Sequence, residues 1–405
     1  MNQKLLILGA GIYQAPLIRK AKEMGLYTIA ASCPGPYPGL ALADQAWLID
    51  TTDTQGLLKR AEWEGIDGVC TSGTDVAIRS LGVLSDRLCL PGIPLEAARI
   101  LTDKYLMKQA FLQGGVSTPP SYQVFSWQEA LLAYEELTPP VIVKAVDSSG
   151  SRGVTRADTP AQLEEAYRRA TLVTKKDYVL VERFLCAHEI GVDGFVHGGC
   201  LKLLLPHDKF IHTTREGATL PAGHHFPYHG SEEVSSEIRR QIQLAVNAVG
   251  MDDCALNADV LVTEDGRVYL LEMGGRAGAT CIPELISLHL GIDYYEQMIR
   301  NALGLSVDFS GDHLSPAMAR LLFSPKPGIL THVDYSFLEK LKGDGVLASL
   351  DYEPGSSIPG VHDATDRIGQ VILQTDSVCL LERALHEIYR HLKIDGNTLE
   401  QLWNE

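Results

Sequence analysis

VYLLEMGGRAGAT, the stretch from Val268 to Thr280, begins with apolar and aromatic residues and ends a predicted strand on a carboxylate, Glu272. Two glycines follow within three positions, and Arg276 comes next. Glycine lets the backbone approach a ligand closely, and an arginine fork can hold an anionic oxygen through two parallel hydrogen bonds. The stretch therefore predicts a strand that presents a charged group to a ligand.

The residues before this stretch predict that its strand is one arm of a hairpin. CALNADVLV reads as the other strand, and EDG supplies the turn. Asn257 and Asp259 are two residues apart, so their side chains share one face. If the carboxylates of Asp259 and Glu272 meet on that face, they form the hard oxygen site that Mg²⁺ prefers. The alternative is a salt bridge between Glu272 and Arg276 at the end of the strand.

The composition is that of an ordinary globular protein. Of the 405 residues, 45% are hydrophobic and 21% are charged, and the formal net charge is −16. Because binding to a polyanion depends on clustered Lys and Arg, and no basic block is present, we expect no nucleic-acid partner. MNQK leads directly into LLILGAG instead of a signal peptide, and no apolar run approaches a membrane span. The eight cysteines contain no C-x-x-C pair and are expected to be reduced thiols. These features predict a cytoplasmic protein without a membrane partner.

The first hundred residues alternate between predicted strands and helices. KLLILGAG, LYTIAAS and IDGVCTSG read as buried strands, and YQAPLIRKAKEMG, DTQGLLKRAEWEG and DVAIRSLGVLSDRLCL read as helices. Such alternation with short glycine turns predicts a doubly wound parallel sheet. Beyond it, the strands PPVIVKAV and KKDYVLVERFL, two hairpins, a helical stretch IPELISLHLGIDYYEQMIRNALG and a final helix LLERALHEIYRHL indicate α+β units. The fold class is therefore α/β.

GAGIYQ, from Gly9 to Gln14, raises the question of dinucleotide binding. Gln14 occupies the position of the third glycine, and no acidic residue for a ribose lies near Ser32, where the second strand ends. A structural or acceptor-facing turn is the favoured interpretation, and an NAD site is the alternative.

VIVKAVDSSGSRGV, at 141–154, places Lys144 in a strand before a loop rich in serine and glycine. The lysine can supply a point charge to a polyphosphate, and small loop residues let backbone N–H groups approach its oxygens. The alternative is a flexible surface loop beside an unrelated lysine.

YVLVERFL then predicts a hinge strand whose exposed main chain can form hydrogen bonds with the edge of an adenine. Glu182 and Glu189 flank this hinge, and the alternative for them is a pair of solvated glutamates.

These pieces follow one another in a fixed order: Lys104, Lys144, the Ser/Gly-rich loop, VERFL…HE and NAD…LLEMGGR. This succession resembles the ATP-grasp superfamily, most closely the branch with biotin carboxylase, the carbamoyl-phosphate synthase large subunit and the purine-pathway carboxylate ligases. LPGIPLEAARILTDKYLMKQAFLQGGVSTPPSY is similar to the junction before the ATP-grasp unit. DATDRIGQVILQTDSVCLLERALHEIYRHLKI is similar to the small C-terminal domain. The resemblance covers nearly the whole chain.

The resemblance implies an α/β architecture with a central two-lobed ATP-grasp unit of α+β type. It implies four domains: a pre-ATP-grasp, Rossmann-like domain with the doubly wound parallel sheet at 1–115, a small ATP-grasp lobe at 116–190, a large ATP-grasp lobe with the metal site at 191–310, and a small C-terminal α+β domain, packed on the ATP-grasp unit, at 311–405.

The resemblance also implies how ATP is bound. Lys104 and Lys144 would contact the phosphates, and Lys144 would also serve catalysis. Glu182 would lie beside the adenine, and Glu189 would hold the ribose hydroxyls. Two backbone segments complete the set of ATP contacts: the mobile loop with Ser148, Ser149, Gly150, Ser151 and Gly153, and the adenine-reading hinge of Arg183, Phe184 and Leu185.

The resemblance further implies one or two Mg²⁺ ions, which Mn²⁺ can replace, bound by Asp259 and Glu272 together with Asn257. Arg276 would stabilise an acyl phosphate or the acceptor carboxylate. One departure concerns Gly274, because many members carry asparagine two residues after the metal-binding glutamate. Either the second ion has fewer protein ligands, or Asn257 supplies the amide from the neighbouring strand.

The segment HDKFIHTTREGATLPAGHHFPYHG, at 207–230, is rich in histidine. In the resembled family this segment is a strand and a lid beside the acceptor pocket. A substrate-facing lid, plain surface and a zinc site all stay open as interpretations. Lys209 and Arg215 in the segment, with Arg276 and Gly278 beyond it, are the expected substrate contacts.

The sequence and the resemblance together predict an ATP-dependent carboxylate–amine or carboxylate–thiol ligase that forms an acyl phosphate and releases ADP and phosphate. Its partners would be a small-molecule carboxylate and an amine or other nucleophile, with an amino acid as a possible acceptor, and the branch favours a homodimer. Two alternatives from other classes are a catalytically silent nucleotide-binding scaffold and an NAD-dependent oxidoreductase.

Overall fold

The computed structural model describes residues 2–213, 219–311, 314–362 and 364–404. The chain divides into two compact units, each assembled from separate segments. The first unit comprises Met1–Pro206, Gly230–Gly278 and Tyr295–Asp308, and the second comprises His207–His229, Ala279–Tyr294 and Phe309–Glu405. The four-domain division stays a prediction, because these two units follow different boundaries.

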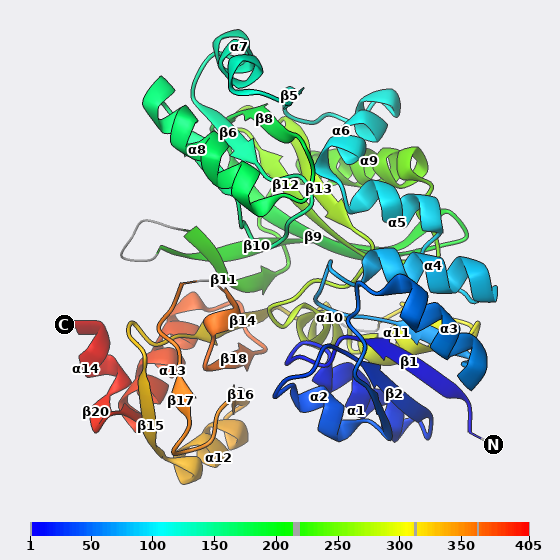
Figure 1. Ribbon diagram of the computed structural model, residues 1–405. Coiled ribbons are helices and arrows are strands. Elements are labelled where there is room, and N and C mark those ends of the chain that lie inside the picture. Colours follow the sequence, from blue (N-terminus) through cyan, green and yellow to red (C-terminus); the bar gives the residue numbers. More distant parts are fainter. Residues whose placement is uncertain (1, 214–218, 312–313, 363, 405) are drawn as a thin grey trace. The chain divides into compact units, whose positions relative to one another are not determined.

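The N-terminal part of the first unit is the predicted parallel sheet, with strand order β3-β2-β1-β4 (Figure 1). Strand β1 is KLLIL, and its four apolar residues are fully buried, as expected for a strand with both faces covered. The elements are β1 (Lys4–Leu8), α1 (Ala15–Glu23), β2 (Tyr27–Ala31), α2 (Pro38–Leu42), β3 (Gln45–Trp47), α3 (Thr54–Glu64), β4 (Gly68–Cys70), α4 (Ile78–Leu88) and α5 (Leu95–Leu101). The predicted doubly wound arrangement of this region is confirmed.

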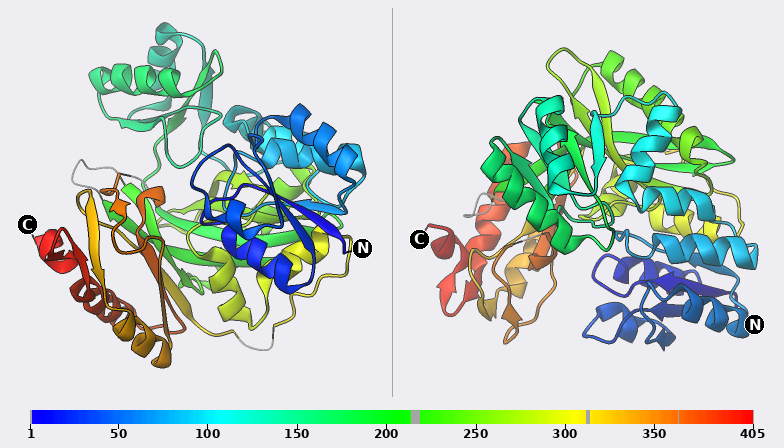
Figure 2. Two further views of the ribbon diagram at one scale, coloured as in Figure 1. Left: turned by 60° about the horizontal axis from the view of Figure 1, so that its bottom comes forward. Right: turned by 45° about the horizontal axis from the view of Figure 1, so that its top comes forward.

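A second sheet of the first unit has the order β5-β8-β6-β7, and Figure 2 shows it with the helices α7 and α8. Both helices begin at side-chain caps, Ser126 for α7 and Thr159 for α8, the latter with a complete capping box. The elements are β5 (Ser121–Val124), α7 (Trp127–Leu137), β6 (Val141–Lys144), β7 (Val154–Ala157), α8 (Pro160–Val173) and β8 (Val179–Arg183).

The largest part of the first unit is built on an antiparallel ladder in the order β13-β12-β9-β10. Helix α9 packs on β13, and α6 packs on α9 (Figure 1). The elements are α6 (Lys104–Gln113), β9 (His188–His197), β10 (Cys200–Thr213), α9 (Glu232–Val249), β12 (Cys254–Val262), β13 (Val268–Gly274) and α11 (Tyr294–Ala302). The two predicted hairpins, β9–β10 and β12–β13, are both present. Strand β10 contains the point at which the chain passes from the first unit to the second.

The second unit has its core around α13, which packs on β14, β18 and β19. The elements are β11 (Thr219–Phe226), α10 (Ile282–Leu290), β14 (Ala317–Leu322), β15 (Gly328–Val333), α12 (Tyr335–Gly343), β16 (Val346–Leu350), β17 (Ser357–Ile358), η1 (Ala364–Asp366), β18 (Gly369–Leu373), α13 (Val378–His391), β19 (Leu392–Ile394), β20 (Asn397–Thr398) and α14 (Leu399–Asn404). Among the described residues, no helix combines the length and apolar character required to span a membrane.

Two helix predictions need correction. The stretch predicted as helical from Ile282 onward forms two helices, because Gly291 adopts a left-handed φ of +70° and ends α10. The predicted final helix is α13, but a further short helix, α14, follows it.

Candidate active site

The hairpin of β12 and β13 brings two carboxylates to one place. Asp259 lies directly opposite Glu272, and Asn257 lies opposite Gly274. The register shifts between Asp259 and Val260, and such a bulge re-aims the side chains beside it. The Glu272 side chain is 44% exposed. Two neighbouring strands therefore each carry a carboxylate at the same level of the ladder, and that of Glu272 is partly exposed.

Lys104 connects this hairpin to the Ser/Gly-rich loop. It is the first residue of α6, a helix that Asp103 caps through two backbone N–H groups. The Lys104 ammonium lies 3.3 Å from Glu272 Oε2 and donates a hydrogen bond of 2.6 Å to the Ser148 carbonyl oxygen. One cation therefore contacts both the expected metal strand and the expected phosphate loop.

Three charged side chains form a buried cluster beside this lysine. Lys144 Nζ lies 2.5 Å from Glu182 Oε1, and Lys108 Nζ lies 2.6 Å from Glu182 Oε2. The side chains of Lys108 and Glu182 are each 2% exposed, and that of Lys144 is 11% exposed. Two ammonium groups face one carboxylate, so the protonated cluster carries an excess positive charge.

The environment shifts the pKa values of all three groups. Burial, reinforced by the neighbouring Lys144, lowers the pKa of Lys108 to about 8, although Glu182 acts in the opposite direction. Burial would also lower the pKa of Lys144, but Glu182 more than offsets it and leaves that pKa raised. Burial would raise the pKa of Glu182, but the two lysines reverse this, so the carboxyl group stays ionised.

The predicted phosphate loop is short and tied at both ends. Asp147 accepts hydrogen bonds from the Thr174 hydroxyl at 2.7 Å and from the Lys175 N–H group at 3.0 Å. The Ser148 hydroxyl donates to the Arg152 carbonyl oxygen at 2.6 Å. Gly153 has a φ of +71°, and a Cβ atom there would lie 2.8 Å from the Ala145 Cβ atom. Glycine is therefore needed where the loop returns to β7, whereas Ser149, Gly150 and Ser151 lie at the tip of the loop.

Arg276 lies in a network that joins two distant parts of the first unit. Its Nε and Nη2 atoms each lie 2.8 Å from an oxygen of Asp75. Its Nη1 atom donates to Asn257 Oδ1 at 2.7 Å, and Asn257 Nδ2 donates to Asp193 Oδ2 at 3.0 Å. Asp193 also accepts from the Gly278 N–H group at 2.9 Å. The guanidinium plane is thus held in a fixed orientation.

This network bears on the missing asparagine at Gly274. The oxygen of the Asn257 amide already accepts a hydrogen bond from Arg276. A Cβ atom at Gly274 would lie 3.0 Å from Asp75 Oδ1 and 3.9 Å from the Arg276 guanidinium. In this structure Asn257 orients the arginine, and a side chain at 274 would press on the same network.

The expected adenine hinge follows β8. The Arg183 N–H group donates to the Pro120 carbonyl oxygen at 2.9 Å, and the Phe184 N–H group donates to that of Pro140 at 3.1 Å. Leu185 is the next residue along the chain and is half-buried. Glu189 lies on β9, where it is exposed and pairs with Leu261 of β12.

The substrate residues predicted from the sequence fall in different parts of the structure. Gly278 belongs to the Arg276 network described above. Lys209 lies on β10 opposite His224, within the second unit. Arg215 lies outside the described residues.

The turn after β1 is filled by a side chain of the protein. Gln14 is 5% exposed, its Oε1 atom accepts a hydrogen bond of 2.9 Å from Gly11, and its amide nitrogen donates to the Ser72 carbonyl oxygen. A Cβ atom at Gly9 would lie 2.9 Å from the same Gln14 oxygen. The glycines of this turn therefore accommodate Gln14.

Sequence reasoning did not single out Lys108, Asp75 or Asp193. Lys108 had a signal, because it lies four residues after Lys104 on a helix and therefore on the same side. Asp193 had a weaker one, as the only charged residue in the apolar run IGVDGFV.

The sequence comparisons address the family of this chain. A family model described as D-ala D-ala ligase C-terminus matches residues 122–301. The D-alanine–D-alanine ligase of Citrifermentans bemidjiense is 30% identical over 229 residues, which cover 54% of this chain and 72% of that protein. The chain belongs to the ATP-grasp ligases. The resemblance found in the sequence is thus confirmed, and the protein is an enzyme.

Two further matches place this ATP-grasp ligase among its relatives. The carbamoyl phosphate synthase large chain of Neisseria meningitidis is 30% identical over 204 residues, or 49% of this chain, but the match spans only 18% of that much longer protein. The crystal structure of phosphoribosylglycinamide synthetase from Anaerococcus prevotii has a TM-score of 0.80 at 29% identity, covering 98% of this chain and all of that one. Solved structures of similar fold contain ADP or MgADP. The ATP-grasp architecture therefore extends through nearly the whole chain.

Proposed function

We propose that this ATP-grasp enzyme is an ATP-dependent carboxylate–amine ligase that activates a small-molecule carboxylate as an acyl phosphate. One observation carries the proposal: Asp259 and Glu272 are paired across a ladder, and Glu272 lies beside Lys104. Lysines next to a pair of carboxylates form the environment that a metal-bound triphosphate requires.

The lysines supply the charge that a polyphosphate needs. Lys144 and Lys108 together outweigh Glu182 by one positive charge, and Lys104 contributes another at the phosphate loop. Because these cations are buried or nearly so, water screens them little and their attraction for phosphate oxygens is strong. Glu182 holds both buried ammonium groups in place before ATP arrives.

The donor set of the hairpin fits magnesium. Asp259 and Glu272 offer carboxylate oxygens, which Mg²⁺ prefers, together with phosphate oxygens and water. When bound, such an ion neutralises charge on the transferring phosphoryl group. Asp259 and Glu272 would hold it, and the Lys104 ammonium lies 3.3 Å from Glu272.

In the first step, a carboxylate oxygen of the substrate attacks the γ-phosphorus of ATP, the bond to the β,γ-bridging oxygen breaks, and ADP leaves. In the second, an amine nitrogen attacks the acyl carbon, the bond to the phosphate oxygen breaks, and inorganic phosphate leaves while the nitrogen loses its proton. Arg276, oriented by Asp75 and Asn257, would hold the anionic oxygens in both steps. Positioning and charge neutralisation carry such reactions.

The names of the relatives support an amine as the nucleophile. The matched ligase joins D-alanine to D-alanine, so an amino acid is the first class of acceptor to test. The alternative of an NAD-dependent oxidoreductase finds no support in the turn at Gly9, because the side chain of Gln14 fills that turn.

Transfer of an isotope tests the mechanism directly. Amino acids and small carboxylates are screened for ADP release with ATP and Mg²⁺, and a productive carboxylate is then supplied with ¹⁸O in its carboxyl group. The acyl-phosphate route requires one ¹⁸O atom in each phosphate released, and mass spectrometry must show a product that has gained the amine and lost water. Unlabelled phosphate alongside that product contradicts the mechanism, and ADP release without any joined product contradicts the ligase function.

A further inference from the structure

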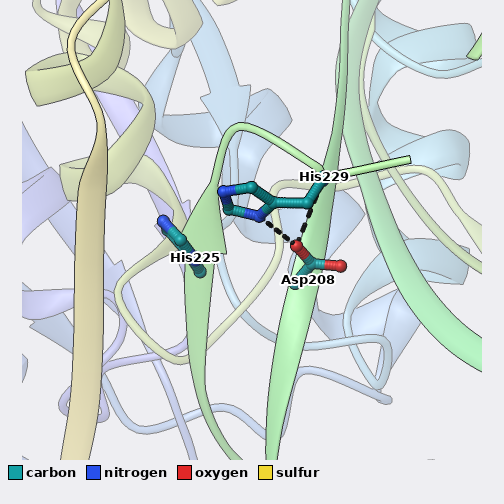
Figure 3. Close-up of side chains that lie close together, drawn as sticks. All are labelled: Asp208, His225 and His229. Atoms are coloured by element: carbon teal, nitrogen blue, oxygen red, sulfur yellow. Dashed lines mark hydrogen bonds and ion pairs between the residues drawn. The ribbon is translucent and has the colours of Figure 1, made fainter. Parts of the chain in front are cut away.

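Three side chains of the second unit gather around one point on β10 and β11 (Figure 3). The antiparallel register places Asp208 directly opposite His225, so both side chains lie on the same face of the ladder. The chain then turns back after β11, and His229 reaches the same carboxylate. The sequence shows that His225 and His229 are four residues apart, but it does not show that Asp208 lies beside them.

The geometry of the group is close to that of a metal site. His229 Nδ1 lies 2.8 Å from Asp208 Oδ2, and the His229 N–H group donates to the same oxygen at 3.2 Å. The rings of His225 and His229 are 4.4 Å apart between centroids. One ligand atom from each of the three residues lies within 4.8 Å of the others.

His225 supplies a second, independent observation. This residue is only 6% exposed, and its Nε2 atom is buried without a hydrogen-bond partner in the described part of the chain. A buried polar atom left unpaired costs about 1–3 kcal/mol. An imidazole with an unused nitrogen, packed beside a histidine and an aspartate, therefore indicates a group that binds there.

We propose that Asp208, His225 and His229 bind a divalent transition-metal ion of the zinc type, at a site separate from the carboxylates of the hairpin. Two imidazoles and one carboxylate favour zinc and its first-row neighbours, whereas Mg²⁺ favours oxygen donors alone. Three protein ligands leave one position of a tetrahedral ion for water or a ligand atom.

Binding requires only a small adjustment. Ligands about 2.0–2.1 Å from a tetrahedral ion lie about 3.3–3.5 Å from one another, and the present atoms extend to 4.8 Å. Asp208 and His225 are held by the ladder, whereas the His229 side chain is 57% exposed and lies beyond the end of β11. His229 is therefore the ligand with the most freedom to adjust, and the ion would take the place of the proton between it and Asp208.

A second histidine–aspartate pair in the same unit can be compared with the pair of His229 and Asp208. His391 Nδ1 lies 2.9 Å from Asp334 Oδ2, almost the same separation as in the His229–Asp208 pair. Among the described residues, however, only the Asp208 group contains three such ligands within reach of one another. The His391 pair is thus an internal control for an ordinary histidine–aspartate contact.

The test is a Co²⁺ titration of the full chain, freed of metal with a chelator and held in excess Mg²⁺ so that the oxygen site is occupied. The wild type should bind one equivalent of Co²⁺ with the visible absorption of a nitrogen-ligated ion, and Zn²⁺ should displace it. His229→Gln and Asp208→Asn should each weaken binding by about tenfold or more, an effect at least as large as that of losing a supporting residue. His391→Gln should leave the affinity unchanged.

The variants also separate this site from the proposed magnesium site. Glu272→Gln should retain Co²⁺ binding at the histidines, because it alters only the hairpin. His229 is exposed, so His229→Gln reports on the site even if substitution of the buried His225 prevents folding. The proposal is overturned if the wild type binds no Co²⁺, or if folded His229→Gln and Asp208→Asn both bind it as tightly as the wild type.

Discussion

Lys108 and Glu182 form an ion pair of 2.6 Å in which each side chain is only 2% exposed. Breaking a buried pair of this kind leaves an uncompensated charge and is costly. Here Lys144 is a second partner for the same carboxylate, so removal of Lys108 still leaves a neutral pair. Lys108 is therefore not required to neutralise Glu182, and it adds one positive charge to the buried cluster.

The lowered pKa of Lys108 predicts a specific pH dependence of stability. Its pKa is about 8 in the folded chain, against an ordinary value of 10.5, so between these values the unfolded chain binds more protons. The free energy of unfolding of the wild type should therefore rise with pH in this window relative to Lys108→Met, by at most about 1.4 kcal/mol per pH unit. Urea unfolding of both proteins at several pH values measures the difference. If the free energies of unfolding of the two proteins change with pH in parallel, Lys108 does not titrate in this window. Lys202→Met, at an exposed position, is the control and should follow the wild type.

Lys144→Ala should weaken ATP binding. A charge-assisted hydrogen bond contributes about 1.5–3 kcal/mol, which corresponds to a loss of affinity of about tenfold or more. Calorimetric titration with MgATP measures it, and Lys202→Ala, an exposed lysine on β10, should bind ATP normally. Unchanged affinity in a folded Lys144→Ala protein would remove this residue from the nucleotide site.

Glu272→Gln should abolish turnover with little loss of stability. Glu272 is 44% exposed and its pair with Lys104 is 3.3 Å long, and exposed pairs contribute about 0–1 kcal/mol. The amide keeps the shape of the side chain but removes the charge that a metal requires. Phosphate release and thermal unfolding are measured together, with Asp265→Asn at the exposed hairpin turn as control. Normal phosphate release by Glu272→Gln would leave the hairpin without a metal-binding role.

Arg276→Lys should lower kcat by about two to three orders of magnitude, the usual effect of losing one oriented donor to a developing anion. Lysine keeps the charge but lacks the planar fork, so it cannot contact both oxygens of Asp75 and the oxygen of Asn257. Steady-state kinetics with the substrate identified by the screen give the comparison. A variant with near-normal kcat would show that Arg276 serves only as an ion-pair partner.

Gly274→Asn tests the residue at which the chain differs from many members of the resembled family. The new Cβ atom would lie 3.0 Å from Asp75 Oδ1, so it should disturb the orientation of Arg276 and slow turnover. Gly274→Ala adds the Cβ atom without the amide and should slow turnover to a similar degree. A faster Gly274→Asn enzyme would mean instead that the second metal position lacked a ligand.

Local pattern predicted much of the fold. Alternating strands and helices indicated the parallel sheet, and the turn signal EDG between two apolar runs indicated the β12–β13 hairpin with Asp259 opposite Glu272. Both depend on neighbouring residues, whose periodicity and turn chemistry are legible in the sequence. The Asp103 cap of helix α6 is a local signal of the same kind.

Contacts between distant segments could not be predicted in the same way. Arg276 meets Asp75, which lies 201 residues earlier, and no periodic pattern encodes such a meeting. The Asp208, His225 and His229 group depends on the register of one ladder, and a shift of one residue would turn the side chains of a strand to the other face. The end of helix α10 at Gly291 also could not be predicted, because it depends on the positive φ of that residue.

The interleaving of the two units decides when each can be completed during synthesis of the chain. Residues 295–308 complete the first unit, yet they leave the ribosome after 207–229 and 279–294, which belong to the second. Asn301 in this late segment donates a hydrogen bond of 2.8 Å to the Asp253 carbonyl oxygen, so the first unit is unfinished until then. A nascent chain halted before Tyr295 contains neither unit whole, and expression of either unit as one uninterrupted fragment must include segments of the other.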